Sequence, residues 1–457
     1  MRTPKITQPS KLILLLVFAF TLFSCNDSED DSQPYITAPP TKGKVLIVGA
    51  GASGLQAGKM LKDEGYDVSI MEASDKIGGR LRKNTTLADM DLDMGAETIY
   101  GNTSDAFQLA TNYGQNLNED TMQPEYWYNN QMYKGDETLA PRDLKEIINY
   151  IYNGHGQTNQ SFEDWADQEG MDSSYDELIE ALANMYGGSA EHVSVPAELQ
   201  ESLKSTTNDQ KFRLRDKTMY DLVNDHLAPY LEENIKLNAP VSKIDYTGDK
   251  VYVTAGQNIY DVDKVIVTVP IKVLQNEYIQ FVPPMGDGKK AAINNIGMEE
   301  CIKVFIKFNE NFFEDNMIVG GRDGSMYYDA THGKDTDDAV IGVQVTGKNA
   351  AELSALDEDH MVQRLLAELD AMYDGKATQT YSGQYVMQDW GKEEFVQGAF
   401  SYEKANTGNL RETLAAPIAK KVYFAGEATN LNGNKGTVSG ALESGVREAN
   451  RVMADFE

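Results

Sequence analysis

A glycine-rich stretch near the N-terminus, KVLIVGAGASGL, constrains the fold more than any other feature of the chain. The apolar run Lys44–Val48 predicts a buried strand, and the helical pattern after the glycines ends before Gly65. A second predicted strand, Asp67–Met71, is followed directly by Glu72. Strand, glycine turn, helix, strand and acid in this order indicate the dinucleotide-binding unit of a doubly wound α/β domain.

Each residue type in this unit has a physical role. Gly49 allows the tight turn, Gly51 lets the backbone approach a pyrophosphate, and Gly54 lets the helix pack against the strand. The start of the helix offers free N–H groups and a positive dipole to phosphates. Glu72 can accept hydrogen bonds from a ribose and would repel a 2′-phosphate. The predicted cofactor contacts here are Gly49, Gly51, Ala52, Ser53, Gly54, Glu72 and Ala73. This pattern alone leaves NAD and FAD open.

The first residues of the chain read as an export signal. A basic start is followed by the twelve-residue apolar run Leu12–Phe23, which is too short to span a bilayer, so residues 1–24 are predicted to be a signal peptide. The stretch LFSC resembles the lipobox of bacterial lipoproteins, which makes Cys25 the predicted lipidation site and residues 25–42 a tether. The acidic residues after Cys25 resemble the surface-export signal of Bacteroidota lipoproteins.

We therefore expect an exported protein, lipid-anchored to a bacterial membrane, most simply the outer one, on its periplasmic or surface face. No twin arginine precedes the apolar run, so we expect the chain to cross unfolded and to acquire its cofactor afterwards. Which face of which membrane stays open.

Charge and cysteine content exclude several classes of function. The formal net charge is −30, so nucleic acid is a poor partner, and membrane contact is expected only through the lipid anchor. The two cysteines, Cys25 and Cys301, cannot build a disulfide framework, and the five histidines are scattered. No metal site is predicted.

The segments EASDKIGGRLRKN and LDMGAETIYG resemble the flavin-containing amine oxidase family, which includes monoamine oxidases, polyamine oxidases and histone lysine demethylases. The resemblance implies FAD as the cofactor. It places Arg80 and the two preceding glycines against the FAD phosphates, and Val241 against the adenine. It also implies backbone contacts beside the flavin from Gly95, Ala96, Glu97 and Thr98. Glu97 and Thr98 differ from the family's usual Ser/Asn-Trp, which leaves the contacts at these two positions open.

The C-terminal stretch KKVYFAGEATNLNGNKGTVSGALESGVREANRV resembles the family's C-terminal FAD motif almost residue by residue, in the form found in polyamine oxidases and lysine demethylases. It predicts a strand over Val422–Ala425 and a helix that begins near Thr437. A helix N-terminus aimed at the flavin would stabilise the negative charge of its reduced form. One small-residue face of this helix is predicted to permit close packing: Gly440, Ala441, Ser444 and Gly445. The predicted contacts with FAD are Gly426, Glu427, Thr437 and Val438, with Glu427 holding the ribityl hydroxyls.

The stretch MEECIKVFIKFNENFF predicts a strand by its alternation, and on this pattern alone Lys303 and Lys307 are both expected in solvent. The resemblance changes the expectation for Lys303, which falls on the family's lysine that holds a water against flavin N5.

Two aromatic positions of the family are altered in this chain. Where monoamine oxidases have two tyrosines that form a cage for the amine, the resemblance places Phe400 and Thr437, and Phe400 could equally belong to the core. Ala399 stands where monoamine oxidases have the cysteine that binds FAD covalently, so non-covalent FAD is expected. Tyr100 stands where some polyamine oxidases have an acid or a histidine, which leaves polyamine specificity open.

The fold class predicted from these segments is α/β: a doubly wound, Rossmann-like FAD-binding domain with an interleaved α+β substrate domain. The FAD-binding domain is expected to be discontinuous, with residues 43–101, 218–284 and 386–457. Residues 102–217, read as mainly helical, and 285–385 are expected to form the substrate domain.

The function expected from the resemblance is that of an FAD-dependent amine oxidase, with catalytic residues Lys303, Phe400 and Thr437. A hydride would pass from the C–H beside the amine nitrogen to the flavin, the imine would hydrolyse to an aldehyde, and O₂ would reoxidise the flavin to give H₂O₂. Alternatives are a desaturase or porphyrinogen-type oxidase, a non-catalytic surface lipoprotein, or an L-amino-acid oxidase. The last would need an arginine for the substrate carboxylate, from among Arg142, Arg213, Arg215, Arg322 and Arg411. The particular amine, the electron acceptor and the oligomeric state stay open.

Overall fold

The computed structural model describes residues 41–457, apart from 135–139, 155–157 and 314, and residues 41–457 form one compact unit. The predicted signal peptide, Cys25 and nearly all of the predicted tether lie outside the described residues. Within the described part, we find no helix that is both long and apolar enough to cross a membrane.

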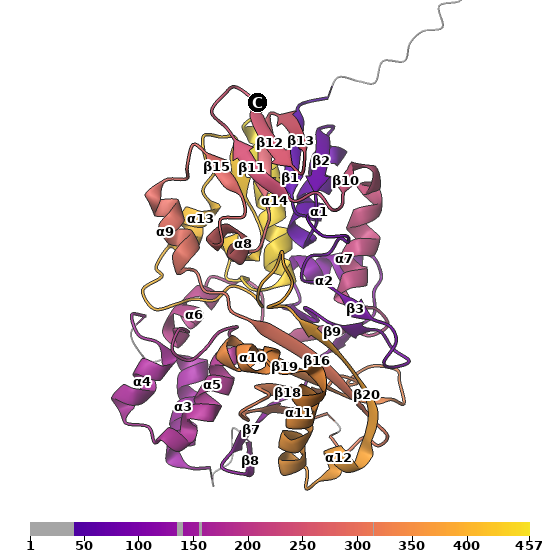
Figure 1. Cartoon of the computed structure of the whole chain (residues 1–457), viewed down its shortest axis with the longest axis vertical. Helices are drawn as coiled ribbons and strands as arrows, with labels where there is room; N and C mark the ends of the chain where they lie inside the picture. Colours follow the sequence, from indigo (N-terminus) through magenta and orange to yellow (C-terminus); the bar gives the residue numbers. More distant parts are fainter. Residues whose placement is uncertain (1–40, 135–139, 155–157, 314) are drawn as a thin grey trace, which may run out of the picture. The chain divides into compact units, whose positions relative to one another are not determined.

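A five-stranded parallel sheet forms the base of the cofactor-binding region (Figure 1). In spatial order its strands are β10 (Ile235–Lys236), β2 (Asp67–Met71), β1 (Lys44–Val48), β14 (Lys264–Val267) and β21 (Val422–Phe424). The strands are short, and β1, β14 and β21 are apolar and almost wholly buried, as expected for a parallel sheet covered on both faces. The first two predicted strands have the predicted bounds, and the third ends one residue earlier, at Phe424.

The strand order reverses beside β1, because the chain passes from β1 to β2 and β10 on one side and places β14 and β21 on the other. Ligands of doubly wound sheets bind at the carboxyl ends of the strands at such a reversal. Gly49 follows β1 at this point, and the Thr268 hydroxyl, just after β14, donates a hydrogen bond to the carbonyl of Val48 at 2.8 Å. The doubly wound fold class predicted from the glycine turn is confirmed.

Two long helices, α1 (Ala52–Asp63) and α14 (Val438–Ala454), pack against each other over this sheet. A Cβ at Gly445 would lie 2.4 Å from the carbonyl oxygen of Ser53, so the close approach of the helices requires a glycine there. The predicted small-residue face of α14 is therefore the packing face. Helices α2 (Asp105–Asn112) and α7 (Met219–Leu227) complete the same core.

A four-stranded sheet follows the parallel one in the same region. Its strands, in order, are β13 (Asn258–Val262), β12 (Val251–Ala255), β11 (Val241–Asp245) and β15 (Gln280–Val282). The helices whose apolar residues share its core are α8 (Ile271–Gln275), α9 (Asp287–Asn295) and α13 (Leu410–Ala415).

A seven-stranded mixed sheet forms the second large layer (Figure 1). In order its strands are β20 (Tyr381–Asp389), β16 (Cys301–Phe308), β19 (Ala339–Thr346), β18 (Met326–Asp329), β17 (Met317–Val319), β7 (Pro124–Tyr128) and β8 (Gln131–Lys134). One face of it packs against α10 (Gly347–Ser354), α11 (Glu358–Met372) and α12 (Lys376–Thr380). Asp357 is the N-cap of α11, and its side chain accepts a hydrogen bond from the backbone N–H of His360 at 3.1 Å.

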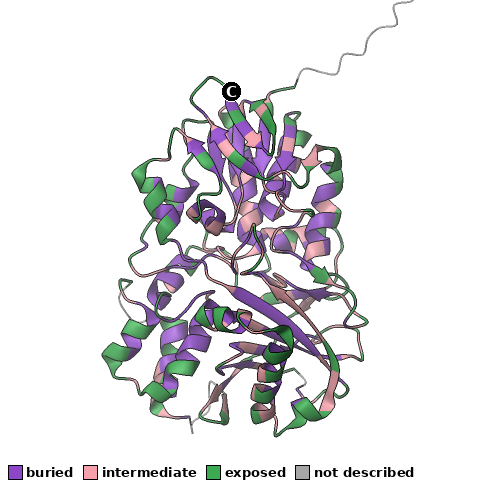
Figure 2. Ribbon diagram, in the orientation of Figure 1, coloured by how far each residue is buried: buried purple, intermediate pink, exposed green. Residues whose placement is uncertain are grey.

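A helical group covers the other end of this layer and consists of α3 (Arg142–Asn153), α4 (Phe162–Glu169), α5 (Asp176–Asn184) and α6 (Val195–Ser202). Figure 2 shows exposed outer faces on α3 and α4, whereas α5 and β16 are buried along most of their length.

Smaller strands join the regions that the sequence assigned to different domains. A three-stranded sheet contains β5 (Thr98–Tyr100), β9 (Lys211–Leu214) and β6 (Leu117–Glu119), and a short pair contains β3 (Lys83–Asn84) and β4 (Leu92–Asp93). The predicted boundary at residue 386 falls inside β20, and α2, which follows the boundary at residue 102, packs with the core of the parallel sheet.

Candidate active site

A single cavity of about 1030 Å³ collects almost all of the residues that the sequence singled out. The predicted site residues on its wall are Gly49, Gly51, Ala52, Ser53, Glu72, Ala73, Arg80, Gly95, Ala96, Glu97, Thr98, Val241, Lys303, Phe400, Gly426, Glu427, Thr437 and Val438. Gly54 does not line the cavity. It has the packing role that was predicted for it, since a Cβ there would lie 2.0 Å from the carbonyl oxygen of Gly49. Cys25 lies outside the described residues.

The glycine turn has the geometry that a dinucleotide needs. Gly49 has φ +108°, which favours glycine, and the space beside Gly51 is open, with no atom nearer than 4.0 Å to a Cβ built there. Behind the turn, the Glu72 carboxylate accepts hydrogen bonds from the backbone N–H of Ala50 at 2.8 Å and of Ser74 at 2.9 Å. The residues present therefore fit a pyrophosphate-bearing cofactor at this turn.

An ion pair joins the Gly78-Gly79-Arg80 segment to the C-terminal motif that contains Gly426 and Glu427, more than 300 residues later in the chain. The Arg80 guanidinium donates to the Glu427 carboxylate at 2.8 Å and to the carbonyl of Ala399 at 2.9 Å. Glu427 also accepts from the N–H and the hydroxyl of Ser401, at 3.2 and 2.6 Å, and from the Gly436 N–H at 2.8 Å.

These contacts keep Glu427 ionised although it is buried. Burial alone would raise the pKa of its carboxyl, but the Arg80 guanidinium, the Ser401 hydroxyl and the Arg411 guanidinium together lower that pKa to about 2. Because a carboxylate has about four acceptor positions, all are used by the protein. The predicted ribityl contact stays a prediction, whereas the observed role of Glu427 is to link the two motifs.

Lys303 lies on β16 with only 2% of its surface exposed. Its ammonium donates to the carbonyl of Gly95 at 2.9 Å and to the carboxylate of Glu97 at 2.7 Å. The expectation from alternation alone, that both lysines of this strand are in solvent, is wrong for Lys303, because its face of the strand packs against the segment that contains Gly95. Lys307 is half-buried and pairs with Asp338 at 2.7 Å.

Glu97 is the centre of a chain of alternating charges behind Lys303. Its carboxylate also accepts from the Tyr328 hydroxyl at 3.0 Å and pairs with Arg213 at 3.3 Å, and Arg213 pairs with Asp120 at 2.9 Å. Burial raises the pKa of Glu97, but the charges of Lys303 and Arg213 outweigh burial and bring the pKa below its ordinary value. Glu97 is therefore ionised at neutral pH, and its carboxylate forms an ion pair with Lys303.

Sequence reasoning missed the partners of Glu97, namely Arg213, Asp120 and Tyr328. The signal that could have found them is Glu97 itself, an acid where the resemblance leads one to expect a small or amide side chain. A carboxylate at a largely buried position needs a cation nearby.

Phe400 and Thr437 lie on the wall of the same cavity. The Phe400 ring lies against two backbone segments, since a Cβ at Gly187 or at Gly436 would lie 2.7 or 3.0 Å from it. Thr437 is the N-cap of α14, and its hydroxyl accepts from the Gly440 N–H at 3.0 Å and donates to the carbonyl of Asn434 at 2.7 Å. The hydroxyl of Thr437 is thus used by the helix cap, which leaves its methyl group as the part that can contact a substrate.

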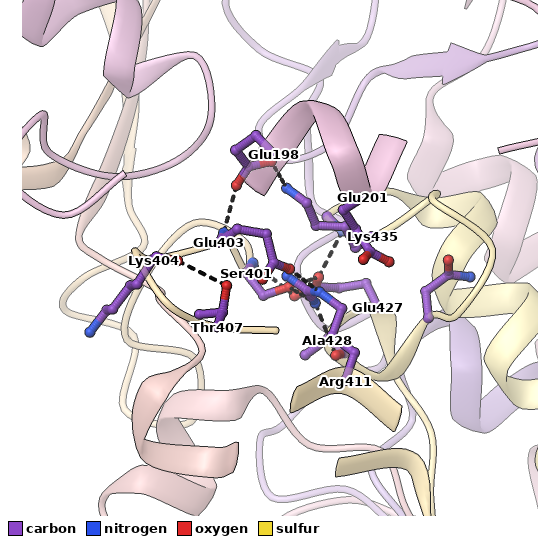
Figure 3. A network of polar contacts seen from close by, with 12 residues as sticks. Glu198, Glu201, Ser401, Glu403, Lys404, Thr407, Arg411, Glu427, Ala428 and Lys435 are labelled. Atoms are coloured by element: carbon purple, nitrogen blue, oxygen red, sulfur yellow. Dashed lines mark hydrogen bonds and ion pairs between the residues drawn. The ribbon is translucent and has the colours of Figure 1, made fainter. Parts of the chain in front are cut away.

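A second polar network, which the sequence did not predict, includes the cavity-wall residues Glu198, Glu427 and Lys435 (Figure 3). Glu198 of α6 pairs with Lys435, and Glu403 pairs with Arg411. Arg411 also donates to the Ser401 hydroxyl at 2.8 Å and to the carbonyl of Ala428 at 2.9 Å. Arg411 therefore serves the fold rather than a substrate carboxylate.

Of the five arginines considered for an amino-acid oxidase, Arg213 lines the cavity and the other four do not. Arg213 is already paired with Glu97 and Asp120. Cys301 lines the cavity as well, but burial raises the pKa of its thiol to about 12, so it is not a thiolate at neutral pH. Among the described residues, no cluster of three or more histidines, cysteines and acids could hold a metal ion.

The chain combines a doubly wound sheet with a glycine turn that fits a pyrophosphate. A second glycine motif and a buried lysine lie on the same cavity. Together these features define the class of FAD-dependent amine oxidoreductases. Residues 52–453 match the family described as flavin containing amine oxidoreductase, so the chain belongs to that family. FAD is the cofactor of this family, and the residues present fit it.

Curated relatives include both demethylases and polyamine oxidases. The chain is 27% identical to lysine-specific histone demethylase 1B of Mus musculus over 90% of its own length, but spans only 53% of that relative. It thus covers about half the length of the first demethylases it matches. It is 26% identical to polyamine oxidase 6 of Oryza sativa subsp. japonica, over 97% of this chain and 96% of the relative.

Solved structures confirm the fold. A putrescine oxidase with bound putrescine superposes with a TM-score of 0.77 at 21% identity, over 90% of this chain and 99% of that chain. A cyclohexylamine oxidase from Brevibacterium oxydans gives a TM-score of 0.76 at 18% identity, with the same coverage. At these identities the likeness shows the arrangement of the chain, not the substrate.

Proposed function

We propose that the protein oxidises a small-molecule amine, with O₂ as the electron acceptor. The observation that carries the proposal is the position of Lys303, a buried charged lysine that enters the cavity between Gly95 and Glu97. Bound FAD supplies hydride acceptance from the C–H next to the amine nitrogen, after which the imine hydrolyses to an aldehyde. The relatives and neighbours named as polyamine, putrescine and cyclohexylamine oxidases support this choice of substrate class.

The residues of the chain supply orientation and charge. A lysine ammonium has three donors, and Gly95 and Glu97 accept two of them, which leaves one for a water or a substrate atom in the cavity. The Gly436 and Thr437 backbone begins α14, whose N-terminal dipole favours negative charge on the cofactor. In this proposal Phe400 positions the amine by contact with its ring.

The cavity must also bind the amine in its neutral form, because the nitrogen lone pair assists the loss of hydride. Amines are protonated in water at neutral pH, so the wall has to favour loss of that proton. The apolar residues of the wall desolvate the ammonium and so lower its pKa. They include Met185, Tyr186, Met317, Met326 and Phe400.

The test is an anaerobic titration of the purified FAD-loaded protein with monoamines, polyamines and amino acids. At least one amine is expected to bleach the flavin absorbance, and admission of air is expected to restore it with one H₂O₂ per cycle. Lys303→Met is expected to retain FAD and slow the bleaching by at least about tenfold, on the scale of one catalytic hydrogen bond. If no amine bleaches the flavin, the desaturase or porphyrinogen-type alternative gains and this proposal fails.

We propose further that FAD is bound non-covalently, because Ala399 offers no thiol at the cavity. Denaturation in acid is expected to release all of the FAD into the supernatant. Yellow colour that stays with the precipitated protein would refute non-covalent binding.

The sequence also supports a lipid anchor at Cys25 on an exported protein. In a bacterial host, the full chain is expected in the membrane fraction and labelled by radioactive palmitate. Cys25→Ala is expected to lose both. Labelling that persists in the Cys25→Ala chain would show that the cysteine is not the acceptor.

A further inference from the structure

The cavity carries a buried ion pair that the proposed reaction does not use. Glu198 of α6 is 3% exposed, and its carboxylate accepts the backbone N–H of Glu403 at 2.6 Å and pairs with the ammonium of Lys435 (Figure 3). The side chain of Lys435 is 11% exposed. Both Glu198 and Lys435 line the cavity.

The pair lies beside the residues proposed to hold the amine. Lys435 precedes Gly436, which lies against the Phe400 ring, and Thr437, which begins α14. The ammonium of Lys435 is therefore a fixed positive charge on the part of the wall that also carries Phe400.

Residues 102–217 and 285–385 contribute carboxylates to the described cavity wall, and each of these carboxylates is already in an ion pair. They are Asp120 and Glu198, which pair with Arg213 and Lys435. Glu97, from the adjoining segment, pairs with Lys303 and with Arg213. An amine with a second ammonium therefore meets no unpaired carboxylate among these three acids, and it meets the charge of Lys435.

We propose that Lys435 is a specificity-determining residue, which neutralises Glu198 and excludes a second positive charge, so that the preferred substrate carries one amino group. This inference rests on the proposed amine oxidation. The remainder of such a substrate is neutral or anionic, because the ammonium of Lys435 has donors beyond the one that Glu198 accepts.

Removal of the lysine is expected to create the opposite preference. In Lys435→Met the buried Glu198 carboxylate loses its cation, and a second ammonium of the substrate can take that place. Burial already raises the pKa of Glu198 in the intact protein, so the gain for a diamine is expected to grow from pH 7 to pH 9, as the bared carboxyl ionises.

The probes are hexylamine and 1,6-diaminohexane, which have the same chain length and differ in one ammonium. Binding is measured by titration calorimetry under nitrogen, on holoprotein whose flavin has been photoreduced so that no turnover occurs. The wild type is expected to bind hexylamine at least tenfold more tightly, which corresponds to about 1.4 kcal/mol. Lys435→Met is expected to abolish or invert this ratio, and Lys435→Arg to keep it.

The double variant Glu198→Gln with Lys435→Met is the matched control, because it has neither the lysine nor a bare buried carboxylate and is expected to gain no diamine binding. The proposal is overturned if the wild type binds the diamine as tightly as hexylamine, or if Lys435→Met leaves the ratio unchanged. It is equally overturned if neither amine binds.

Amine oxidation is assayed separately with the same two probes on the oxidised holoprotein. If the two amines bind with the expected ratio but no amine bleaches the flavin, the proposed function is refuted while the exclusion of a second charge is supported. Bleaching by hexylamine and by the diamine at equal kcat/KM would refute the role of Lys435 alone.

Discussion

Replacement of Glu427 by glutamine is expected to destabilise the protein by about 3 kcal/mol at pH 7. The contacts with Arg80 and Ser401 bring the pKa of the buried carboxyl from 4.5 to about 2. Each pKa unit corresponds to about 1.4 kcal/mol, so the ionised group contributes about 3 kcal/mol to folding. Glutamine removes this charge and turns an N–H₂ group toward groups that are themselves donors, which leaves donors unpaired in the core.

The pH dependence has a definite sign. The folded-state pKa lies below the unfolded one, so the stability from Glu427 is fully present above pH 4.5 and is lost as pH falls through about 2. Most of the difference between wild type and Glu427→Gln is therefore expected to persist from pH 7 to pH 4, and to shrink by more than half near pH 3.

The assay is urea unfolding of the FAD-free proteins, followed by tryptophan fluorescence, at pH values from 3 to 8. Glu352→Gln, at an exposed carboxylate on α10, is the matched control and is expected to change the free energy of unfolding by less than about 0.5 kcal/mol. A loss below about 1 kcal/mol for Glu427→Gln at pH 7, or a loss that grows as the pH falls to 3, would refute the reasoning.

Three further predictions concern other buried positions. Burial lowers the pKa of Lys289 to about 7, so between pH 7 and 10.5 the unfolded chain binds more protons than the folded one. The stability of the wild type is therefore expected to rise through that range. In Lys289→Met this rise is expected to disappear, as measured by thermal unfolding. Burial raises the pKa of Asp93 to about 7, so the stability of the wild type is expected to fall from pH 3.8 to 7, and Asp93→Asn should remove that fall. If stability depends on pH in Lys289→Met or in Asp93→Asn as it does in the wild type, the pKa shift assigned to that residue is contradicted. Gly445→Ala is expected to cost about 1–3 kcal/mol, because the Cβ would lie 2.4 Å from the carbonyl oxygen of Ser53, whereas Gly288→Ala on α9, with nothing within 4 Å, serves as its neutral control in the same unfolding assay.

The parts of the fold that the sequence predicted are those fixed by local chemistry. The glycine turn after Val48 and the helix that starts after Thr437 each depend on a few adjacent residues, whose backbone needs admit few alternatives. Their predicted positions agree with the structure to within one residue. The meeting of both motifs at one cavity followed from the family resemblance rather than from spacing.

What could not be predicted is the pairing of charges between distant segments. Lys303 reads as a solvated strand residue until Glu97, more than 200 positions away, is placed next to it. Glu198 and Lys435 are 237 positions apart. Alternation tells which face of a strand a residue occupies, but not what covers that face, and a short-range pattern carries no information about a partner chosen by tertiary packing.

The extent of strand β20 shows the same limit. The bound predicted at residue 386 falls inside β20, whose backbone is paired with β16 on both sides of that residue. Hydrogen bonding along a sheet edge extends as far as the partner strand allows, and the length of that partner is a property of a segment some 80 residues earlier.

Charge outside and inside the cavity has opposite consequences for an amine substrate. The net charge of −30 attracts any ammonium compound, and more strongly a compound with several charges, so the surface alone favours polyamines. Within the cavity Glu97, Asp120 and Glu198 are already paired with Lys303, Arg213 and Lys435, so these three acids offer no new ion pair, and desolvation favours the neutral amine. An amine with one amino group loses its single charge as one proton, whereas a diamine must lose two protons or leave an ammonium beside Lys435. The surface attracts both amines, but loss of one proton neutralises only the amine with one amino group. Selection between the two amines is therefore expected to depend on the ion pairs inside the cavity and not on the surface charge.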